Sequence, residues 1–116
     1  MHKLTFVDTT LKKYGLDLAD LNHVLSILKK NERIQSVILF GSRAIGNFHA
    51  GSDVDLALKG DHLNLDDILD ASLEIDELFL PYKFDLIIFD RIKEETLIDH
   101  ISRMGIKLFT RDLIAE

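Results

Sequence analysis

The sequence predicts a small α/β domain in which helices pack on one face of a mixed β-sheet. Short apolar runs of the length of buried strands alternate with longer segments whose apolar residues recur every three or four positions. The chain contains no internal repeat, low-complexity tract or linker. Its 116 residues suffice for one hydrophobic core and are too few for two, so we expect a single domain over residues 1–116.

Two helices are predicted before the first strand. The first covers about Val7 to Tyr14 and is ended by Gly15, which interrupts the pattern. The second begins behind Asp17, a residue type that favours the N-cap position, and ends near Asn31. Its apolar side chains recur at the spacing of one helix face: Leu18, Leu21, Val24, Leu25 and Leu28.

Four short apolar segments have the composition of strands. Those at Ser36 to Phe40 and Phe84 to Phe89 are mostly apolar, as buried strands are. In the segment Val54 to Leu58 the apolar residues fall on alternate positions, so one face packs and the other is free to bind. Ile106 to Phe109 adds a short terminal strand.

The second half of the chain also contains two amphipathic helices. Asn64 opens the first helix and Pro81 closes it. Its apolar stripe comprises Leu65, Ile68, Leu69, Ile75 and Phe79, and its solvated acidic side comprises Asp66, Asp67, Asp70, Glu74, Asp76 and Glu77. Partner docking through these acids is the less favoured alternative. Asp90 is expected to cap the second helix, which Gly105 ends and whose stripe comprises Leu97, Ile98, Ile101 and Met104.

The composition sets limits on location and partners. The chain has no cysteine, which excludes disulfides and thiolate metal sites, and its N-terminus lacks the apolar core of a signal peptide. No apolar run approaches the ~20 residues that cross a bilayer, so we expect a cytoplasmic protein without a membrane partner. The net charge of −6 argues against direct binding of nucleic acid, whose affinity comes largely from Lys and Arg. Small nucleotides remain compatible, because bound metal ions carry the compensating charge.

The turn at Gly41 and Ser42 has the features of a phosphate-binding site. A backbone that leaves a buried strand through Gly and Ser can direct its N–H groups at an anion such as a triphosphate. The Ser42 hydroxyl is then expected to donate to the β or γ phosphate. The simpler interpretations are that Gly41 and Gly46 serve only the backbone angles of the turn and that Ser42 caps a short helix.

Three acidic residues follow this turn. Asp53 and Asp55 lie two positions apart, so on a strand both carboxylates project from one face. Asp is disfavoured in strands, and two like charges so placed repel each other unless a cation lies between them. Such hard oxygen ligands suit Mg²⁺, with Mn²⁺ as the alternative ion. Asp85 is the preferred third ligand because it interrupts an apolar strand, whereas Asp90 lies only at that strand's end.

The order and spacing of these residues resemble the DNA polymerase β-like nucleotidyltransferase superfamily. Its signature is a Gly-Ser pair, a spacer, Asp-x-Asp on the next strand and a third Asp on a later strand. The matching residues here are Gly41 and Ser42, then Asp53 and Asp55, then Asp85. More narrowly, Gly-Ser-Arg-x-x-Gly followed by Ser-Asp-x-Asp-Leu resembles the minimal nucleotidyltransferases (MNT proteins) of prokaryotes. The resemblance covers roughly residues 18–109 and implies a polymerase β palm-like fold, with ATP as substrate.

The residues around the motif have alternative roles. Arg43 either contacts phosphate directly or is an ion-pair partner of one of the acids. Many members of the family carry a second Arg where this chain has Ile45, which leaves less positive charge near the phosphates. Ser52 suits a turn or a supporting hydrogen bond, and the loop residue His49 is expected to be solvated. The candidate nucleotide-binding residues are Gly41, Ser42, Arg43 and Ser52.

Together these features predict a two-metal nucleotidyl transfer. Asp53 and Asp55 bridge two divalent ions, and Asp85 completes the shell of the ion that activates the attacking hydroxyl. The acceptor oxygen attacks the α-phosphorus, and Asp85 is available to take its proton. Ser42 and the turn backbone stabilise the departing pyrophosphate, so catalysis consists mostly of positioning and charge stabilisation.

The acceptor is expected to come from a partner protein. A chain of this length leaves no second domain to enclose an acceptor. The resemblance to MNT proteins implies a small helical HEPN toxin as partner, with AMP transferred from ATP to one of its tyrosine hydroxyls and this chain acting as the antitoxin. The alternatives are a non-catalytic module that sequesters such a partner, and a small-molecule nucleotidyltransferase, which normally has an extra helical domain. The oligomeric state stays open, a homo-oligomer included.

Overall fold

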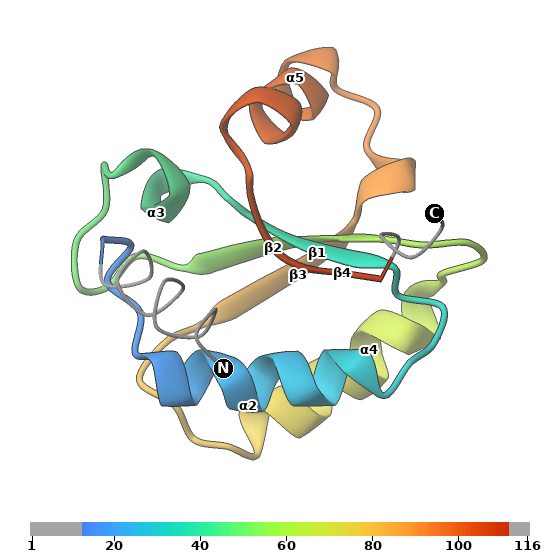
Figure 1. Ribbon diagram of the computed structural model, residues 1–116, viewed down its shortest axis with the longest axis horizontal. Coiled ribbons are helices and arrows are strands. Elements are labelled where there is room, and N and C mark those ends of the chain that lie inside the picture. Colours follow the sequence, from blue (N-terminus) through green and yellow to red (C-terminus); the bar gives the residue numbers. More distant parts are fainter. Residues whose placement is uncertain (1–12, 112–116) are drawn as a thin grey trace.

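The centre of the molecule is a four-stranded β-sheet with the strand order β3-β2-β1-β4 (Figure 1). The computed structural model describes residues 13–111. Within them β1 (Ser36–Phe40) pairs antiparallel with β2 (Val54–Lys59) and with β4 (Ile106–Thr110), whereas β2 pairs in parallel with β3 (Phe84–Ile88). The sheet is therefore mixed, as predicted, and each strand starts at the residue expected from the sequence.

Two helices, α2 (Leu18–Lys29) and α4 (Leu65–Asp76), lie together on one face of this sheet (Figure 1). Asp17 caps α2 and Asn64 caps α4, each accepting a hydrogen bond from a backbone N–H of the first turn, which confirms both predicted caps. No helix in the described part of the chain combines the length and apolar composition that a membrane span requires. The earlier helix predicted over Val7 to Tyr14 lies almost entirely outside the described residues.

The main hydrophobic core fills the space between these two helices and the sheet. Alternate residues of the strands point into it, because successive side chains of a strand face opposite sides. From the strands it contains Val37, Leu39, Val54, Leu56, Leu58, Leu86 and Ile88, and from the helices Leu21, Val24, Leu25, Leu28, Ala71 and Ile75. Burial of this apolar surface is the main term that stabilises the fold.

The second face of the sheet is partly covered by α5 (Glu95–Met104), which lies opposite α2 and α4 (Figure 1). Ile101 of α5 packs there in a smaller cluster with Ile38, Phe40 and Ala57. The expectation of helices on one face holds for α2 and α4 and is wrong for α5. The physical reason is that all five residues of β1 are buried, so this strand requires apolar cover on both sides.

The acidic helix α4 differs from its predicted form at its C-terminal end. It stops at Asp76, before Pro81, and Phe79 lies beyond it with a φ of 52° and 89% exposure. Its buried face is formed by Ala71 and Ile75, with Ile68 partly buried beside them. Leu65 and Leu69, which were predicted to lie on this buried face, instead point outward and are exposed.

Asp90 does not cap α5, so the capping role predicted for it is wrong. It lies in a short 3-10 helix, η1 (Phe89–Arg91), that follows β3 directly. The N-cap of α5 is Glu94, whose side chain makes no capping hydrogen bond. The extra turn of η1 therefore displaces the start of α5 by several residues from the end of the strand.

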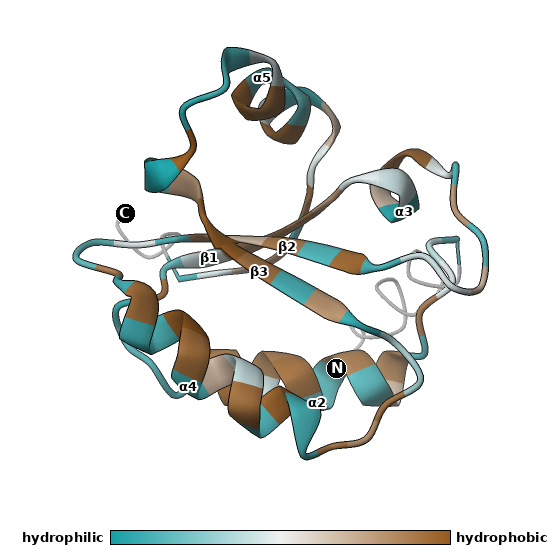
Figure 2. Ribbon diagram, turned by 180° about the vertical axis from the view of Figure 1, so that it is seen from behind, coloured by the Kyte–Doolittle hydropathy of each residue, from teal (hydrophilic) through white to brown (hydrophobic). Residues whose placement is uncertain are grey.

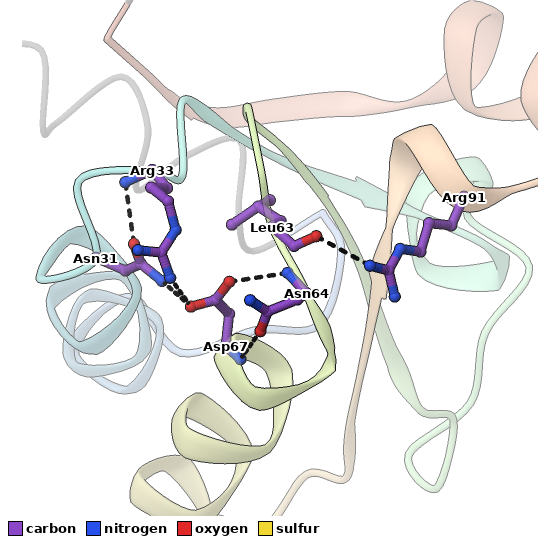
Figure 3. Close-up of polar contacts among 6 residues, drawn as sticks. All are labelled: Asn31, Arg33, Leu63, Asn64, Asp67 and Arg91. Carbon is purple, nitrogen blue, oxygen red and sulfur yellow. Dashed lines mark hydrogen bonds and ion pairs between the residues drawn. The ribbon is translucent and has the colours of Figure 1, made fainter.

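Asp67, predicted to be solvated, is buried and joins the end of α2 to the start of α4 (Figure 3). Its carboxylate accepts hydrogen bonds from the Asn64 backbone N–H at 2.8 Å and from Asn31 Nδ2 at 3.0 Å, and it forms an ion pair with Arg33. The Asn64 side chain accepts a hydrogen bond from the Asp67 N–H, which completes a capping box. A buried carboxylate is tolerated here because these donors satisfy its oxygens.

Replacing Asp67 by Ala is expected to lower the free energy of unfolding at pH 7 by about 2 kcal/mol, since a capping bond and a buried ion-pair partner are lost together. Burial raises the pKa of Asp67, but the hydrogen bonds from Asn64 and Asn31 and the Arg33 charge outweigh this effect and lower it. Because the folded pKa lies below the unfolded value of about 3.9, the stabilisation is present above that pH and is lost as pH falls through the folded pKa.

Urea denaturation at pH 7 and at pH 3 measures this effect. The deficit of the Asp67→Ala variant should shrink at the lower pH. Asp70→Ala is the matched control, because Asp70 lies on the same helix and is exposed. Equal losses in the two variants at pH 7 would contradict the role assigned to Asp67.

Candidate active site

Two of the three candidate acids, Asp55 and Asp85, project from the second face of the sheet, the side that carries α5. Asp55 of β2 and Asp85 of β3 are register partners in the parallel pair, so their side chains point in the same direction. Their neighbours two residues along, Ala57 and Ile87, both belong to the cluster under α5. Asp53 directly precedes β2, two residues before Asp55. The structure thus places Asp85 on the same side as Asp55.

The electrostatics of Asp55 reflect this crowding. Burial raises the pKa of its carboxyl, and the charges of Asp85 and Asp53 raise it further, while His100 acts in the opposite direction. Asp55 is partly buried, whereas Asp53 and Asp85 are exposed. The site therefore concentrates negative charge at one end of β2 and β3, where a cation would relieve the repulsion.

Asp55 and Asp85 supply donors of the type that binds a divalent cation together with a nucleotide. Within residues 13–111 no group of three or more acidic or histidine side chains already surrounds one point closely enough to form a complete metal site. The backbone nevertheless sets Asp55 and Asp85 side by side. Carboxylate oxygens completed by water and substrate phosphates are the ligands that Mg²⁺ prefers in proteins.

The Gly41-Ser42 turn lies beside these acids, because Phe40, the last residue of β1, is the register partner of Asp55. Gly41 has a φ of 81°, and a Cβ at this position would overlap the Asp55 carboxylate. Both the backbone angle and the close approach therefore require glycine. The short helix α3 (Ser42–Ile45) follows, with Gly41 at its N-cap and no side-chain cap bond, so Ser42 does not have the capping role considered above.

Arg43 differs from both of its predicted roles. The side chain is 2% exposed, and its guanidinium donates only to backbone carbonyls among the described residues. Nε and Nη2 donate to the carbonyl oxygen of Ser52 at 3.2 and 3.0 Å, and Nη2 also donates to Ala50 at 3.5 Å. Nη1 donates to Tyr14 at 3.0 Å and to Gly15 at 3.1 Å. All five N–H donors are thereby used, so Arg43 in this arrangement neither reaches a phosphate nor pairs with an acid.

The aromatic rings around Arg43 add to its structural role. The guanidinium carbon lies 5.2 Å from the centre of the Phe48 ring and 5.5 Å from that of Tyr82. Such contacts between a guanidinium and aromatic faces stabilise a buried cation. Arg43 therefore connects the segment before α2, the loop after α3 and the segment that leads into β3.

Ser52 and His49 form the turn that presents Asp53. The Ser52 hydroxyl accepts a hydrogen bond from the His49 backbone N–H at 2.9 Å, while its carbonyl oxygen accepts from Arg43. His49 itself is exposed, as expected. Ser52 thus has the supporting role that was one of its two predicted functions.

His100 is a site residue that the sequence analysis did not identify. Its Nε2 accepts a hydrogen bond from the Gly41 backbone N–H at 3.0 Å, and its ring meets Phe40 edge-on at 6.2 Å. A phosphate that used the Gly41 N–H would have to displace this imidazole. No local pattern marks His100, because it comes from α5 and lies 59 residues from Gly41 along the chain.

A family model covers the part of the chain that contains these residues. The model of the family described as "Polymerase beta, Nucleotidyltransferase" matches residues 22–113, a range that contains the turn and all three acids. Since this is most of the chain, the chain belongs to that family of nucleotidyltransferases.

Several solved structures contain chains that are similar in fold to this one. One chain in the crystal structure of a toxin–antitoxin with AMP-PNP has a TM-score of 0.65 at 22% identity, over 78% of this chain and 73% of that chain. One in the complex of tri-AMPylated Shewanella oneidensis HEPN toxin with MNT antitoxin has a TM-score of 0.61 at 17% identity, over 84% and 75%. A putative nucleotidyltransferase from Sulfolobus solfataricus has a TM-score of 0.52 at 16% identity, over 89% and 88%. At these identities the likeness establishes a shared fold. No curated protein matches this chain.

Proposed function

We propose that this chain transfers AMP from ATP to a hydroxyl of a protein partner and thereby acts as an antitoxin. The observation that carries the proposal is the adjacency of Asp55 and Asp85 on paired strands beside the glycine turn at Gly41. Membership of the nucleotidyltransferase family supports the class of reaction. A location in the cytoplasm, where ATP and magnesium are available, is part of the same proposal.

The chain's own residues would perform the transfer as follows. Magnesium held by Asp53, Asp55 and Asp85 would neutralise phosphate charge and make the acceptor hydroxyl more acidic. The Ser42 hydroxyl donates a hydrogen bond to the triphosphate and orients it. The acceptor oxygen forms a bond to the α-phosphorus, the bond to the bridging oxygen breaks, and pyrophosphate leaves. Asp85, which is exposed, takes the acceptor proton at its carboxylate.

The acceptor in this proposal is a tyrosine of a HEPN-type toxin. Two observations support it. Asp53 and Asp85 are exposed, so an acceptor can approach the acids from outside the domain. A structure with the same fold contains a HEPN toxin that carries AMP groups in complex with an MNT antitoxin. We therefore infer that a partner surface supplies the hydroxyl.

Intact-mass measurement of a partner tests the proposal. The chain is co-expressed with the product of the adjacent reading frame, and that product should gain the mass of one or more AMP groups. With Asp53→Asn in place of the native chain, the gain should disappear while the two proteins still co-purify. A stable complex whose partner keeps its mass would favour the non-catalytic module. ATP turnover with a small acceptor and no partner would favour a small-molecule nucleotidyltransferase.

A further inference from the structure

The side of α4 that faces away from the sheet carries a row of exposed leucines. Leu65 is 60% exposed, Leu69 50% and Leu73 64%. They follow one another at intervals of four residues, so they form one line along the helix. We call these three residues the leucine row. Leucines so exposed and so regularly spaced are unusual on a monomer surface and indicate contact with another molecule.

An apolar groove runs beside the leucine row, along the free edge of β3. It has a volume of about 360 Å³ and is lined by residues of three segments, among them Leu65 and Ile68 of α4, Leu86 and Ile88 of β3, and Ile92 and Leu97 near α5. β3 is an edge strand of the described sheet, so this side of it pairs with no other described strand. We call this feature the edge groove. Leu65 belongs to both features, which makes them one continuous apolar surface.

The other flank of the leucine row is acidic. Successive residues of a helix are rotated by about 100° around its axis, which places three acids beside the leucine row on the side away from the edge groove. These acids, all exposed, are Asp66, Asp70 and Glu77. α4 contains no basic residue. Figure 2 shows the resulting alternation of hydrophobic and hydrophilic segments along α4. A partner that matches this pattern has an apolar row with Lys or Arg along one side.

A second copy of the chain does not match this pattern. Two α4 helices related by a two-fold axis perpendicular to them would run antiparallel and place the acidic flank of one against the acidic flank of the other. With the axis along the helices they would run parallel, and each acidic flank would face the edge-groove side of the other copy, where no row of Lys or Arg meets it. Like charges so opposed disfavour the pairing. The formal net charge of −6 adds to this repulsion.

We propose that the leucine row and the edge groove form the docking surface for an amphipathic helix of a partner, whose apolar residues are flanked by Lys or Arg. The surface continues to the active site through β3. Ile87 lines the groove and lies two residues along β3 from Asp85, on the same face of the strand. A helix seated here brings its protein alongside the acids, which is how an acceptor would be presented; this consequence rests on the proposed nucleotidyl transfer.

Binding measurements with single variants test the docking surface. The probe is the product of the adjacent reading frame, titrated calorimetrically against the purified chain. Leu69→Glu keeps a good helix former while removing the central apolar contact and adding a charge of the disfavoured sign, so Kd should rise about 10- to 100-fold. Met104→Glu is the matched control, because Met104 is 47% exposed and lies on α5; its Kd should stay within about twofold of the native value.

A charge variant tests the acidic flank separately. Asp70→Lys should weaken binding several-fold, and the loss should diminish as salt is added. The melting temperature and the affinity for MgATP should match the native chain in each variant, which separates docking from folding and from the nucleotide site.

Three results would overturn the proposal: native affinity in Leu69→Glu, no binding of the probe to the native chain, or a native dimer in solution that Leu69→Glu dissociates. The last would assign the surface to a second copy. The same variants distinguish a failure of docking from a failure of the proposed nucleotidyl transfer. If Leu69→Glu abolishes binding and the native chain never modifies the probe, docking stands and the proposed function fails. If the Leu69→Glu variant still modifies the probe with unchanged KM, the proposed function stands and the docking surface is wrong.

Discussion

Asp55→Asn is expected to reduce nucleotidyl transfer by at least about a thousandfold while making the metal-free protein more stable at pH 7. The substitution keeps the size of the side chain and removes its charge, so the fold is retained and the ligand is lost. Transfer depends on that charge, because the phosphates and the acids must be brought together around divalent cations.

The gain in stability follows from the pKa of Asp55. Burial, and then the charges of Asp85 and Asp53, raise this pKa in the folded chain. A folded pKa above the unfolded value of about 3.9 means that stability falls as pH rises from that value through the folded pKa, and it stays lower at pH 7. Asn does not ionise and avoids this loss. The gain is therefore expected as a higher Tm of the variant in the absence of metal.

Two measurements on the same preparation check these effects. Transfer is followed in single-turnover reactions with MgATP, and thermal unfolding is followed in EDTA at pH 7 and pH 4. The advantage of Asp55→Asn in Tm should be present at pH 7 and nearly absent at pH 4. Asp61→Asn is the control, because Asp61 is exposed in the turn after β2. Retained transfer, or a lower Tm in EDTA at pH 7, would contradict the assignment of Asp55.

Arg43→Met is expected to lower the free energy of unfolding by about 3–5 kcal/mol, which is a large part of the stability of such a domain. Methionine keeps much of the volume and removes all five donors. The carbonyl oxygens of Tyr14, Gly15, Ala50 and Ser52 would then be left without them. Leaving buried acceptors unsatisfied costs more than the net value of the hydrogen bonds.

Urea denaturation without nucleotide measures this loss. Arg43→Lys should recover only part of it, since one ammonium group cannot span four carbonyls. Arg103→Met is the control, because Arg103 is exposed and its ion pair is with Asp99 on the same helix; its effect should be below about 1 kcal/mol. If Arg43→Met has the same free energy of unfolding as the native chain but a higher KM for ATP, direct contact with phosphate, one of the two roles predicted for Arg43, would be supported instead.

Much of the fold was predictable because its signals are local. The strand at Ser36–Phe40 is a continuous apolar run, and the caps at Asp17 and Asn64 precede clear helical periodicity. The second cover of the sheet by α5 was missed, because an apolar strand does not show from its own composition how many of its faces are packed. The outward leucine row was missed for a related reason, since α4 has two apolar rows and periodicity alone does not choose between them.

In the candidate site, too, some features were predictable from the sequence and others were not. The amino-acid sequence by itself selected the Gly41-Ser42 turn and the acids Asp53, Asp55 and Asp85 as candidates, because the spacing of Asp53 and Asp55 predicts a common face on a strand and the motif resembles that of a known family. Only the tertiary structure decided the register that pairs Asp55 with Asp85, the burial of Arg43 and the approach of His100 to Gly41. These depend on contacts between segments far apart in the chain, and the energy of such contacts comes from packing and desolvation that no single segment encodes.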